Sequence, residues 1–207
     1  EWDFRKGLSF VAAELPFGFD GALEVPLGEG KRIFLHGYID RLDRCGGGVL
    51  IRDYKSGRAR PREKEEAGPV PSLDVQLVAY ALALLAMREK GIFPHPAPSG
   101  AAYVYPDPFR NPPERAFEGE EFAALLDAGR AWLRAAVGML EGRTFPRTPD
   151  PDDCRYCPFR PVCGEGAQAR DAARWEGAAR GPDGGAAAAF LRIKGAKAHV
   201  GGAEEEG

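Results

Sequence analysis

Long apolar runs, histidines and an excess of charge of either sign are all scarce in this sequence. No stretch of the 207 residues approaches the roughly 20 apolar residues that span a bilayer, and none has the pattern of a signal peptide. The formal net charge of −3 argues against a uniformly basic coat for nucleic acid, although it allows a local basic groove. With 44% hydrophobic and 29% charged residues, we expect a soluble, cytoplasmic protein with one sizeable core. Because the sequence opens without methionine, we also expect a fragment of something longer.

Cysteine is rare too, and its placement is uneven. Three of the four cysteines, Cys154, Cys157 and Cys163, fall within ten residues. This spacing is typical of a metal or cluster site rather than a disulfide framework. Zinc usually takes four Cys or His ligands, and no histidine lies near this segment. Scattered reduced thiols are the remaining alternative.

Short alternating or β-branched runs separated by glycine turns fill the first half of the chain, and longer apolar runs follow. This order predicts an α+β or mixed α/β arrangement of layers. The Ala/Gly-rich end predicts a weakly ordered tail over 166–207, after a domain over 1–165. The expected strands are 10–15, 22–27, 32–43, 49–57 and 101–105, and the expected helices are 72–90, with Ser72 as N-cap, and 120–142.

Residues 37–57, GYIDRLDRCGGGVLIRDYKSG, predict a β-hairpin in which two aspartates face each other. If Gly46-Gly47 forms a two-residue turn, Asp40 lies opposite Asp53 with Cβ atoms about 5 Å apart. Side chains alternate along a strand, so Lys55 lies on the same face as Asp53. Two opposed carboxylates repel each other, and a divalent cation between them removes that repulsion. Their hard oxygen ligands suit Mg²⁺ or Mn²⁺.

Two other arrangements of this hairpin stay open at this point. Both aspartates can face solvent and pair with the neighbouring Arg41, Arg44 or Arg52, in surface ion pairs that are common and weak. A register slip of one residue would also separate the two carboxylates. The spacing alone does not decide among these arrangements.

Four short motifs, in this order along the chain, resemble those of the PD-(D/E)XK nuclease superfamily. They are closest to its RecB/AddB-like branch, found in bacterial helicase–nuclease repair complexes. The motifs are GYIDRLD (37–43), IRDYKSG (51–57), QLVAY (76–80) and CRYCPFRPVC (154–163), the last with the C-x₂-C-x₅-C spacing of the iron–sulfur members. The resemblance spans about residues 10–165. It implies a restriction-endonuclease-like α/β fold, in which a central mixed sheet with an antiparallel hairpin core is flanked by helices.

The resemblance also implies metal-dependent hydrolysis of phosphodiester bonds. Asp40 and Asp53, joined by the backbone carbonyl of Tyr54, would bind Mg²⁺ or Mn²⁺, which activates water and neutralises charge on the phosphate. Lys55 would position or deprotonate that water and stabilise the transition state. The other residues implied are Gln76 and Tyr80, four apart on a helix, which would orient the lysine or contact DNA, and Glu14, which would line the metal centre or stabilise the sheet. Without the resemblance, Gln76 and Tyr80 would be interpreted as the edge of an amphipathic helix.

By the same resemblance, Cys154, Cys157 and Cys163 would bind a [4Fe–4S] cluster whose fourth cysteine lies far upstream, outside this fragment. The cluster would pin the C-terminal segment onto the domain. Cys45 is about 17 Å along the strand from the first aspartate, so we interpret it as a turn residue. The first core helix of the family has no counterpart here and is expected upstream of the first residue.

A charged loop follows the hairpin. Arg58, Arg60, Arg62 and Lys64 predict either a guide for DNA phosphates, with salt-dependent affinity, or a solvated linker, since three glutamates lie among them. Tyr103, further along, predicts either stacking on a base or a place in the sheet. Nothing in the sequence suits the reading of bases in a groove, so we expect DNA to be bound non-specifically.

Together these features predict a Mg²⁺- or Mn²⁺-dependent deoxyribonuclease. We expect an exonuclease on single-stranded or resected ends that acts with a helicase in double-strand-break repair. The alternatives are a CRISPR-adaptation-type exonuclease, an inactive scaffold of the same fold that binds DNA or a partner, and an interaction module whose hairpin aspartates lie on the surface. The joint presence of Asp40, Asp53 and Lys55 favours catalysis over the scaffold.

Overall fold

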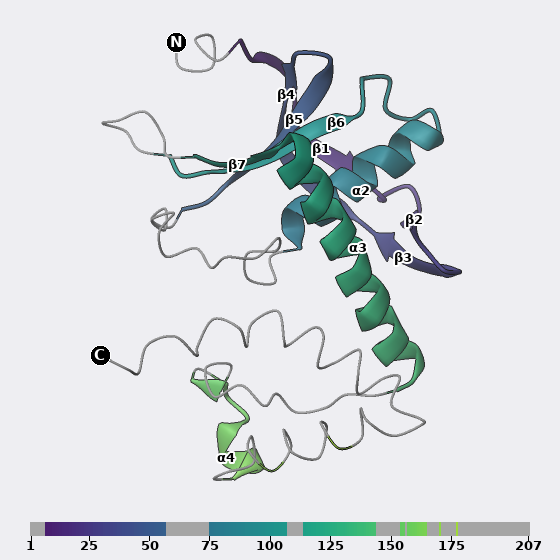
Figure 1. The fold of residues 1–207 in the computed structure, drawn as a ribbon, viewed down its shortest axis with the longest axis vertical. Helices are drawn as coiled ribbons and strands as arrows, with labels where there is room; N and C mark the ends of the chain where they lie inside the picture. Colours follow the sequence, from purple (N-terminus) through teal and green to yellow (C-terminus); the bar gives the residue numbers. More distant parts are fainter. Residues whose placement is uncertain are drawn as a thin grey trace. The chain divides into compact units, whose positions relative to one another are not determined.

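The structure, a computed structural model, describes residues 7–56, 75–106, 114–143, 154–155, 157–164, 170 and 177 (Figure 1). The chain divides into two compact units, Glu1–Arg130 and Ala131–Gly207, and each is described by itself. None of the helices in the described ranges is both long enough and apolar enough to cross a bilayer. The elements are β1 (Ser9–Phe17), β2 (Leu23–Gly28), β3 (Lys31–Leu35), β4 (Gly37–Cys45), β5 (Gly48–Tyr54), α2 (Gln76–Glu89), β6 (Pro98–Val104), β7 (Glu114–Glu118), α3 (Gly119–Glu141) and α4 (Arg160–Cys163).

A five-stranded sheet in the order β1–β4–β5–β6–β7 forms the centre of the first unit, and β2 pairs with β3 in a separate hairpin. β5 and β6 are parallel, whereas the other neighbouring strands are antiparallel. Parallel neighbours need a long crossover connection, and α2 lies in the connection between β5 and β6. This mixed sheet with an antiparallel hairpin at its centre confirms the expected fold class.

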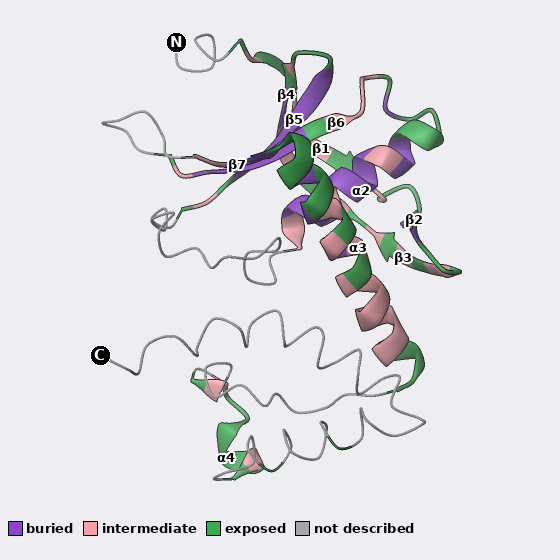
Figure 2. Cartoon of the chain, viewed as in Figure 1, coloured by how far each residue is buried: buried purple, intermediate pink, exposed green. Residues whose placement is uncertain are grey.

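The core of the first unit lies between the sheet and α2, which packs on β2, β5 and β6. α2 is apolar on most of its circumference, so more than half of its residues are buried, and its last two residues are exposed (Figure 2). The first part of α3 approaches α2 closely. A Cβ atom at Gly129 would lie 2.5 Å from a side-chain carbon of Val78, so only glycine allows this approach. The buried residues of α2 are Leu77, Val78, Ala81, Leu82, Ala83, Leu84, Ala86 and Met87.

The expectation of a single strand over 32–43 was wrong, because these residues form two strands in different sheets. β3 ends at Leu35 and β4 begins at Gly37. At the break, the ring of Phe17 lies 3.1 Å from the position of a Cβ on Gly37, and a Cβ on Gly18, whose φ is +75°, would collide with the Leu35 carbonyl. Exposed and less exposed residues alternate through the break without interruption. The period of two in the sequence therefore does not reveal that one strand ends and another begins here.

Three smaller differences concern the start of α2 and two short elements that were not expected. α2 starts at Gln76 after Val75, so Ser72 is not its N-cap. β7 was not expected, because Glu114, Arg115 and Glu118 make its five residues resemble a loop. The short α4 was not expected either. The predicted tail lies outside the described residues except for positions 170 and 177, and the expected domain boundary at 165 stays a prediction.

Candidate active site

The register of the β4–β5 hairpin is the one expected from a Gly46-Gly47 turn. The strands pair from Cys45 opposite Gly48 to Arg41 opposite Arg52. The next rung would join Asp40 to Asp53, and the regular ladder ends just before it. Gly46 has a φ of +55°, a left-handed conformation that glycine adopts at little cost in a tight turn. The two aspartates are therefore neighbours across two adjacent strands.

Asp40 is held where the ladder ends. Its Oδ2 accepts a hydrogen bond of 2.9 Å from the backbone N–H of Tyr54, the residue after Asp53. A side-chain oxygen thus takes the place of a backbone carbonyl as the partner of this N–H. The bond ties the Asp40 carboxylate to the end of β5, beside the second aspartate.

Asp53 is buried, with 1% of its surface exposed, and Lys55 provides its counter-charge. Lys55 Nζ lies 2.9 Å from Asp53 Oδ2, and it also donates a hydrogen bond of 2.5 Å to Oε1 of Gln76. The Lys55 side chain is 31% exposed, so the ammonium group lies at the boundary between core and solvent. The sum of the charges on Asp40, Asp53 and Lys55 is −1, which leaves the group able to attract a cation.

Gln76 and Tyr80 lie one turn apart at the start of α2, as expected. Gln76 Nε2 donates a hydrogen bond of 2.8 Å to the Tyr80 hydroxyl. Burial raises the pKa of Tyr80 above its ordinary value, and the charges of Asp40 and Asp53 raise it further, while Gln76 and Lys55 act in the opposite direction. Tyr80 therefore lies within electrostatic reach of both carboxylates, and the contacts Asp53–Lys55–Gln76–Tyr80 form one continuous chain.

Tyr103 is a further member of this group. It pairs with Asp53 across the parallel β5–β6 ladder, and Lys55 Nζ lies 5.0 Å from the centre of its ring. An ammonium group at this distance from an aromatic face is attracted by the ring quadrupole. With 8% of its surface exposed, Tyr103 lies in the sheet rather than on a base-stacking surface. The sequence offered no sign of its partner, because the pairing of parallel strands depends on the crossover between them.

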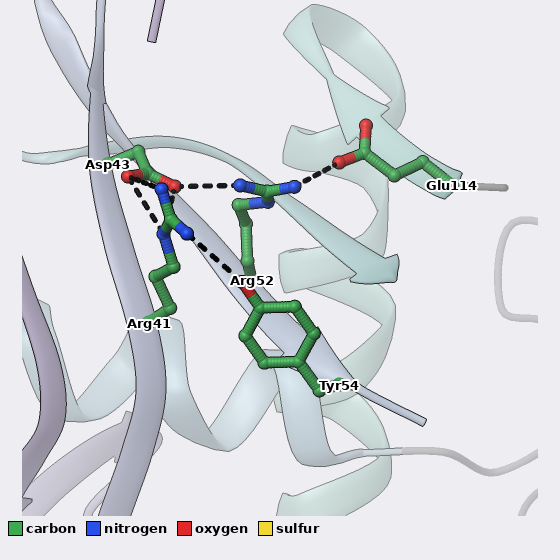
Figure 3. A network of polar contacts seen from close by, with 5 residues as sticks. All are labelled: Arg41, Asp43, Arg52, Tyr54 and Glu114. Carbon is green, nitrogen blue, oxygen red and sulfur yellow. Dashed lines mark hydrogen bonds and ion pairs between the residues drawn. The ribbon is translucent and has the colours of Figure 1, made fainter. Parts of the chain in front are cut away.

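The alternative in which both aspartates face solvent and pair with arginines is wrong. Arg41 and Arg52 both bind Asp43, which belongs to the opposite face of the hairpin from Asp53 and Lys55 (Figure 3). Arg44 is exposed on β4. A register slip is excluded as well, since the observed pairs match the expected ones.

Glu14 lies on β1 between the pairs Ala13–Arg41 and Leu15–Ile39, so its backbone runs beside Asp40. The residue is exposed and has a φ of +48°. Left-handed backbone at a residue with a Cβ costs roughly 1–2 kcal/mol. Such conformations gather at functional sites, where the surrounding structure maintains them.

The remaining expected residues fall into two groups. Arg58, Arg60, Arg62 and Lys64 lie outside the described residues. Cys154, Cys157 and Cys163 are partly buried and form no disulfide; the first two precede α4, and Cys163 is its last residue. Over the described ranges, no set of three or more His, Cys, Asp or Glu side chains is arranged to hold a metal ion. The iron–sulfur site at these cysteines stays a prediction.

The aspartate pair fits a small divalent cation by the chemistry of its donors. Mg²⁺ is usually held by one or two carboxylates, and waters and substrate phosphates fill the other positions. Asp40 and Asp53 supply these carboxylates from neighbouring strands, and their charge exceeds that of Lys55. Tyr54, whose backbone carbonyl was expected to take part, follows Asp53 at the end of β5.

Comparison with known proteins agrees with this geometry. Residues 2–164 match the PD-(D/E)XK nuclease superfamily. Since the match covers most of the chain, the chain belongs to this superfamily, whose members are hydrolytic nucleases that usually use divalent metals. The RecB/AddB-like branch and its iron–sulfur motif stay predictions.

Two individual proteins are similar to this chain. One is a subunit of the ATP-dependent helicase/deoxyribonuclease of Symbiobacterium thermophilum, which is 37% identical over 103 residues, or 45% of this chain and 9% of that protein. The chain thus spans less than a tenth of the length of this relative. The crystal structure of SSO0001 matches with a TM-score of 0.32 and 16% identity, over 78% of this chain and 62% of that one. At that TM-score the match says nothing about function.

Proposed function

We propose that this chain is a metal-dependent deoxyribonuclease domain with Asp40, Asp53 and Lys55 at its active site. The observation that carries the proposal is a continuous series of contacts that runs from Asp53 through Lys55 and Gln76 to Tyr80. Asp40 lies beside this series, because its carboxylate accepts a hydrogen bond from the backbone N–H of Tyr54. Membership of a nuclease superfamily supports a hydrolytic reaction at a phosphodiester.

Asp40 and Asp53, with the carbonyl of Tyr54, would hold Mg²⁺ or Mn²⁺. The ion would lower the pKa of a bound water and offset charge on the phosphate. Lys55 Nζ orients the attacking water and stabilises the negative charge that develops on the phosphoryl oxygens. Gln76 Oε1 restrains that ammonium group, and Tyr80 in turn restrains the Gln76 amide. Glu14, at the neighbouring edge of the sheet, lines the same centre.

The name of the relative supports a proposal for the substrate and the partner. The Symbiobacterium protein is named for both a helicase and a deoxyribonuclease. We infer that this domain works on DNA supplied by a helicase, as an exonuclease on single-stranded or resected ends in double-strand-break repair in the cytoplasm. The basic residues Arg58, Arg60, Arg62 and Lys64 would guide the DNA backbone without reading its sequence, with an affinity that falls as salt rises.

An iron–sulfur cluster at Cys154, Cys157 and Cys163 is a separate part of the proposal. It needs a fourth ligand and a rearrangement of the three thiols, and it would be structural. Anaerobic purification of the full-length protein tests it. A brown protein with visible charge-transfer absorption that is lost in Cys157→Ser supports the cluster. A colourless protein with stoichiometric zinc contradicts it.

The nuclease proposal is tested with end-labelled single-stranded DNA in Mg²⁺ or Mn²⁺. We expect cleavage by the wild type, and loss of cleavage on adding a chelator and in both Asp53→Ala and Lys55→Ala. Two exposed residues of the same types, Asp20 and Lys90, supply the matched controls Asp20→Ala and Lys90→Ala. Equal background cleavage in the wild type and in both active-site variants would mean that the activity belongs to a contaminant and that the proposal is wrong.

A further inference from the structure

The face of the β4–β5 hairpin opposite Asp53 carries a second set of charged residues. Figure 3 shows Arg41, Asp43, Arg52 and Glu114 joined by hydrogen bonds and ion pairs, and we call these four residues the ion network. Nε and Nη2 of Arg41 donate to Oδ1 of Asp43 at 3.0 and 2.9 Å. Arg52 donates to Asp43 Oδ2 at 3.1 Å and to Glu114 Oε1 at 2.9 Å. Two positive and two negative charges balance.

Three side chains of the ion network are buried, and the fourth, Arg41, is 24% exposed. Asp43 is 0% exposed and Arg52 2% exposed. A buried ion pair contributes little net stability, because desolvation of the charges offsets their attraction, and apolar residues of similar volume often stabilise a protein as well or better. Stability alone therefore does not account for four ionic side chains inside this sheet. In some proteins, buried ionic groups favour one arrangement of the chain over alternative arrangements.

The ion network lies where the register of the hairpin decides whether Asp40 and Asp53 face each other. Arg41 and Arg52 face each other on the last regular rung of the hairpin, immediately before the Asp40–Asp53 position. Two arginines opposite each other repel, and Asp43 between them converts this repulsion into two ion pairs. A slip of one residue would turn the side chains of one strand to the other face and break the Arg52–Asp43 pair, which joins β5 to β4, while the Arg41–Asp43 pair within β4 would remain.

A direct path leads from the ion network to the first aspartate. Arg41 Nη1 donates to the Tyr54 hydroxyl at 3.3 Å, and the backbone N–H of Tyr54 donates to Asp40 Oδ2 at 2.9 Å. A guanidinium group stays charged in proteins, so the contacts of Arg41 with Asp43 and Tyr54 are charge-assisted hydrogen bonds. Tyr54 is held at both ends, by its hydroxyl on one face and by its amide next to the site.

We propose that Arg41 and Asp43 are positioning residues for the metal-binding carboxylate of Asp40 and act on it through Tyr54. The inference rests on the proposed function for the identity of the bound ion, but it concerns residues that do not touch the ion. Arg52 and Glu114 complete the ion network by connecting it to β7. Partners that orient the ligands of a metal typically change its affinity by about 10- to 100-fold when they are removed.

The first experiment isolates the Tyr54 hydroxyl. Tyr54→Phe keeps the ring and the backbone amide and removes only the acceptor of Arg41. We expect the affinity of the 207-residue chain for Mn²⁺, measured without DNA from the electron paramagnetic resonance signal of the free ion, to fall about 2- to 10-fold. The melting temperature should stay near that of the wild type. Tyr38→Phe is the matched control, because Tyr38 is an exposed tyrosine of β4 whose ring contacts Phe19 rather than the ion network.

The second experiment replaces the whole ion network by apolar residues, as Arg41→Met, Asp43→Leu, Arg52→Met and Glu114→Leu together. If these residues only stabilise the sheet, this variant should bind Mn²⁺ like the wild type. If they position Asp40, the variant should melt at the wild-type temperature or above and bind Mn²⁺ at least about 10-fold more weakly. If the variant does not fold, the result with Tyr54→Phe decides.

Unchanged Mn²⁺ affinity in Tyr54→Phe, or an equal loss in Tyr38→Phe, would overturn the inference. Absence of Mn²⁺ binding by the wild type would overturn both this inference and the proposed function. A wild type that binds Mn²⁺ but cuts no DNA, together with weaker binding in Tyr54→Phe, would contradict the proposed function alone.

Discussion

The two faces of the β4–β5 hairpin carry similar numbers of charged residues and use them in different ways. The face of Asp53 and Lys55 carries two carboxylates and one ammonium group, which pairs with Asp53 and stays partly exposed. On the other face, two guanidinium groups and two carboxylates balance, and Asp43 and Arg52 are almost fully buried. In a balanced and buried group the opposite charges pair with one another, so the group does not attract an external ion. The unbalanced group retains negative charge at an accessible edge, which is the condition for binding a cation.

The two faces share one backbone, so they are not independent. Successive residues of β5 point alternately to the two groups, and Tyr54 contacts both through its hydroxyl and its amide. A change in one group therefore affects the other only through the register and the end of the strand. We accordingly expect changes on the first face to alter the chemistry directly, and single changes on the second face to alter stability and, through Tyr54, the affinity for the metal ion.

The largest expected effect is on the first face. Asp53→Asn should reduce the rate of DNA cleavage by about a thousandfold or more, because charge stabilisation by a metal ion supplies several kcal/mol. The free energy of unfolding should change less than in Asp43→Asn, because the Lys55 side chain left without its carboxylate is 31% exposed and water can solvate its ammonium group. Single-turnover cleavage rates and urea unfolding measure the two quantities. Unfolding of this variant at room temperature would contradict the separation of the faces.

The matching change on the second face is Asp43→Asn, which leaves two arginines with one carboxylate. Breaking a buried ion group by removing one partner costs about 3–5 kcal/mol, so we expect a loss of this order in the free energy of unfolding. Urea denaturation, followed by circular dichroism, gives the value. A variant as stable as the wild type would show that the ion network contributes no more than an exposed salt bridge.

A smaller effect, with opposite signs for stability and activity, is expected at Glu14. Glycine adopts a φ near +48° without the penalty of a Cβ, so Glu14→Gly should raise the free energy of unfolding by about 1 kcal/mol. If the carboxylate lines the metal centre, cleavage should slow in the same variant. Glu14→Gln, which keeps the backbone penalty, separates the contribution of the charge from that of the strand conformation. A slower Glu14→Gly with a normal Glu14→Gln would assign the effect to the backbone.

The smallest expected effect concerns pH and Tyr80. Its raised pKa means that the native state holds the phenol proton more tightly than the unfolded chain does. This contribution to stability is complete below the ordinary pKa of 10.0 and is lost as the pH rises through the higher native value. Tyr80→Phe should therefore weaken the decline in the free energy of unfolding above pH ~10. The pH dependence of cleavage between neutrality and that limit should keep its shape, which a pH–rate profile checks.

Much of the site was predictable because it depends on short-range rules. The glycine turn and the period of two place Asp40 beside Asp53 and Lys55 on the face of Asp53, and the structure has this register. Gln76 and Tyr80 were identified through the family resemblance, since their spacing alone indicates only the edge of an amphipathic helix. Ser72 failed as an N-cap, and 32–43 failed as one strand, because the helix start and the strand break depend on neighbouring packing rather than on local preference.

The sequence by itself determined the hairpin, its turn and the facing aspartates, since these depend only on the geometry of residues a few positions apart. Only the tertiary structure decided which charges belong together. The parallel pairing of β5 with β6 brought Tyr103 to Lys55, the packing of α2 brought Gln76 to the same ammonium group, and β7 brought Glu114 to Arg52. Such contacts join residues far apart in the chain, and they form only when the sheet and its helices pack together.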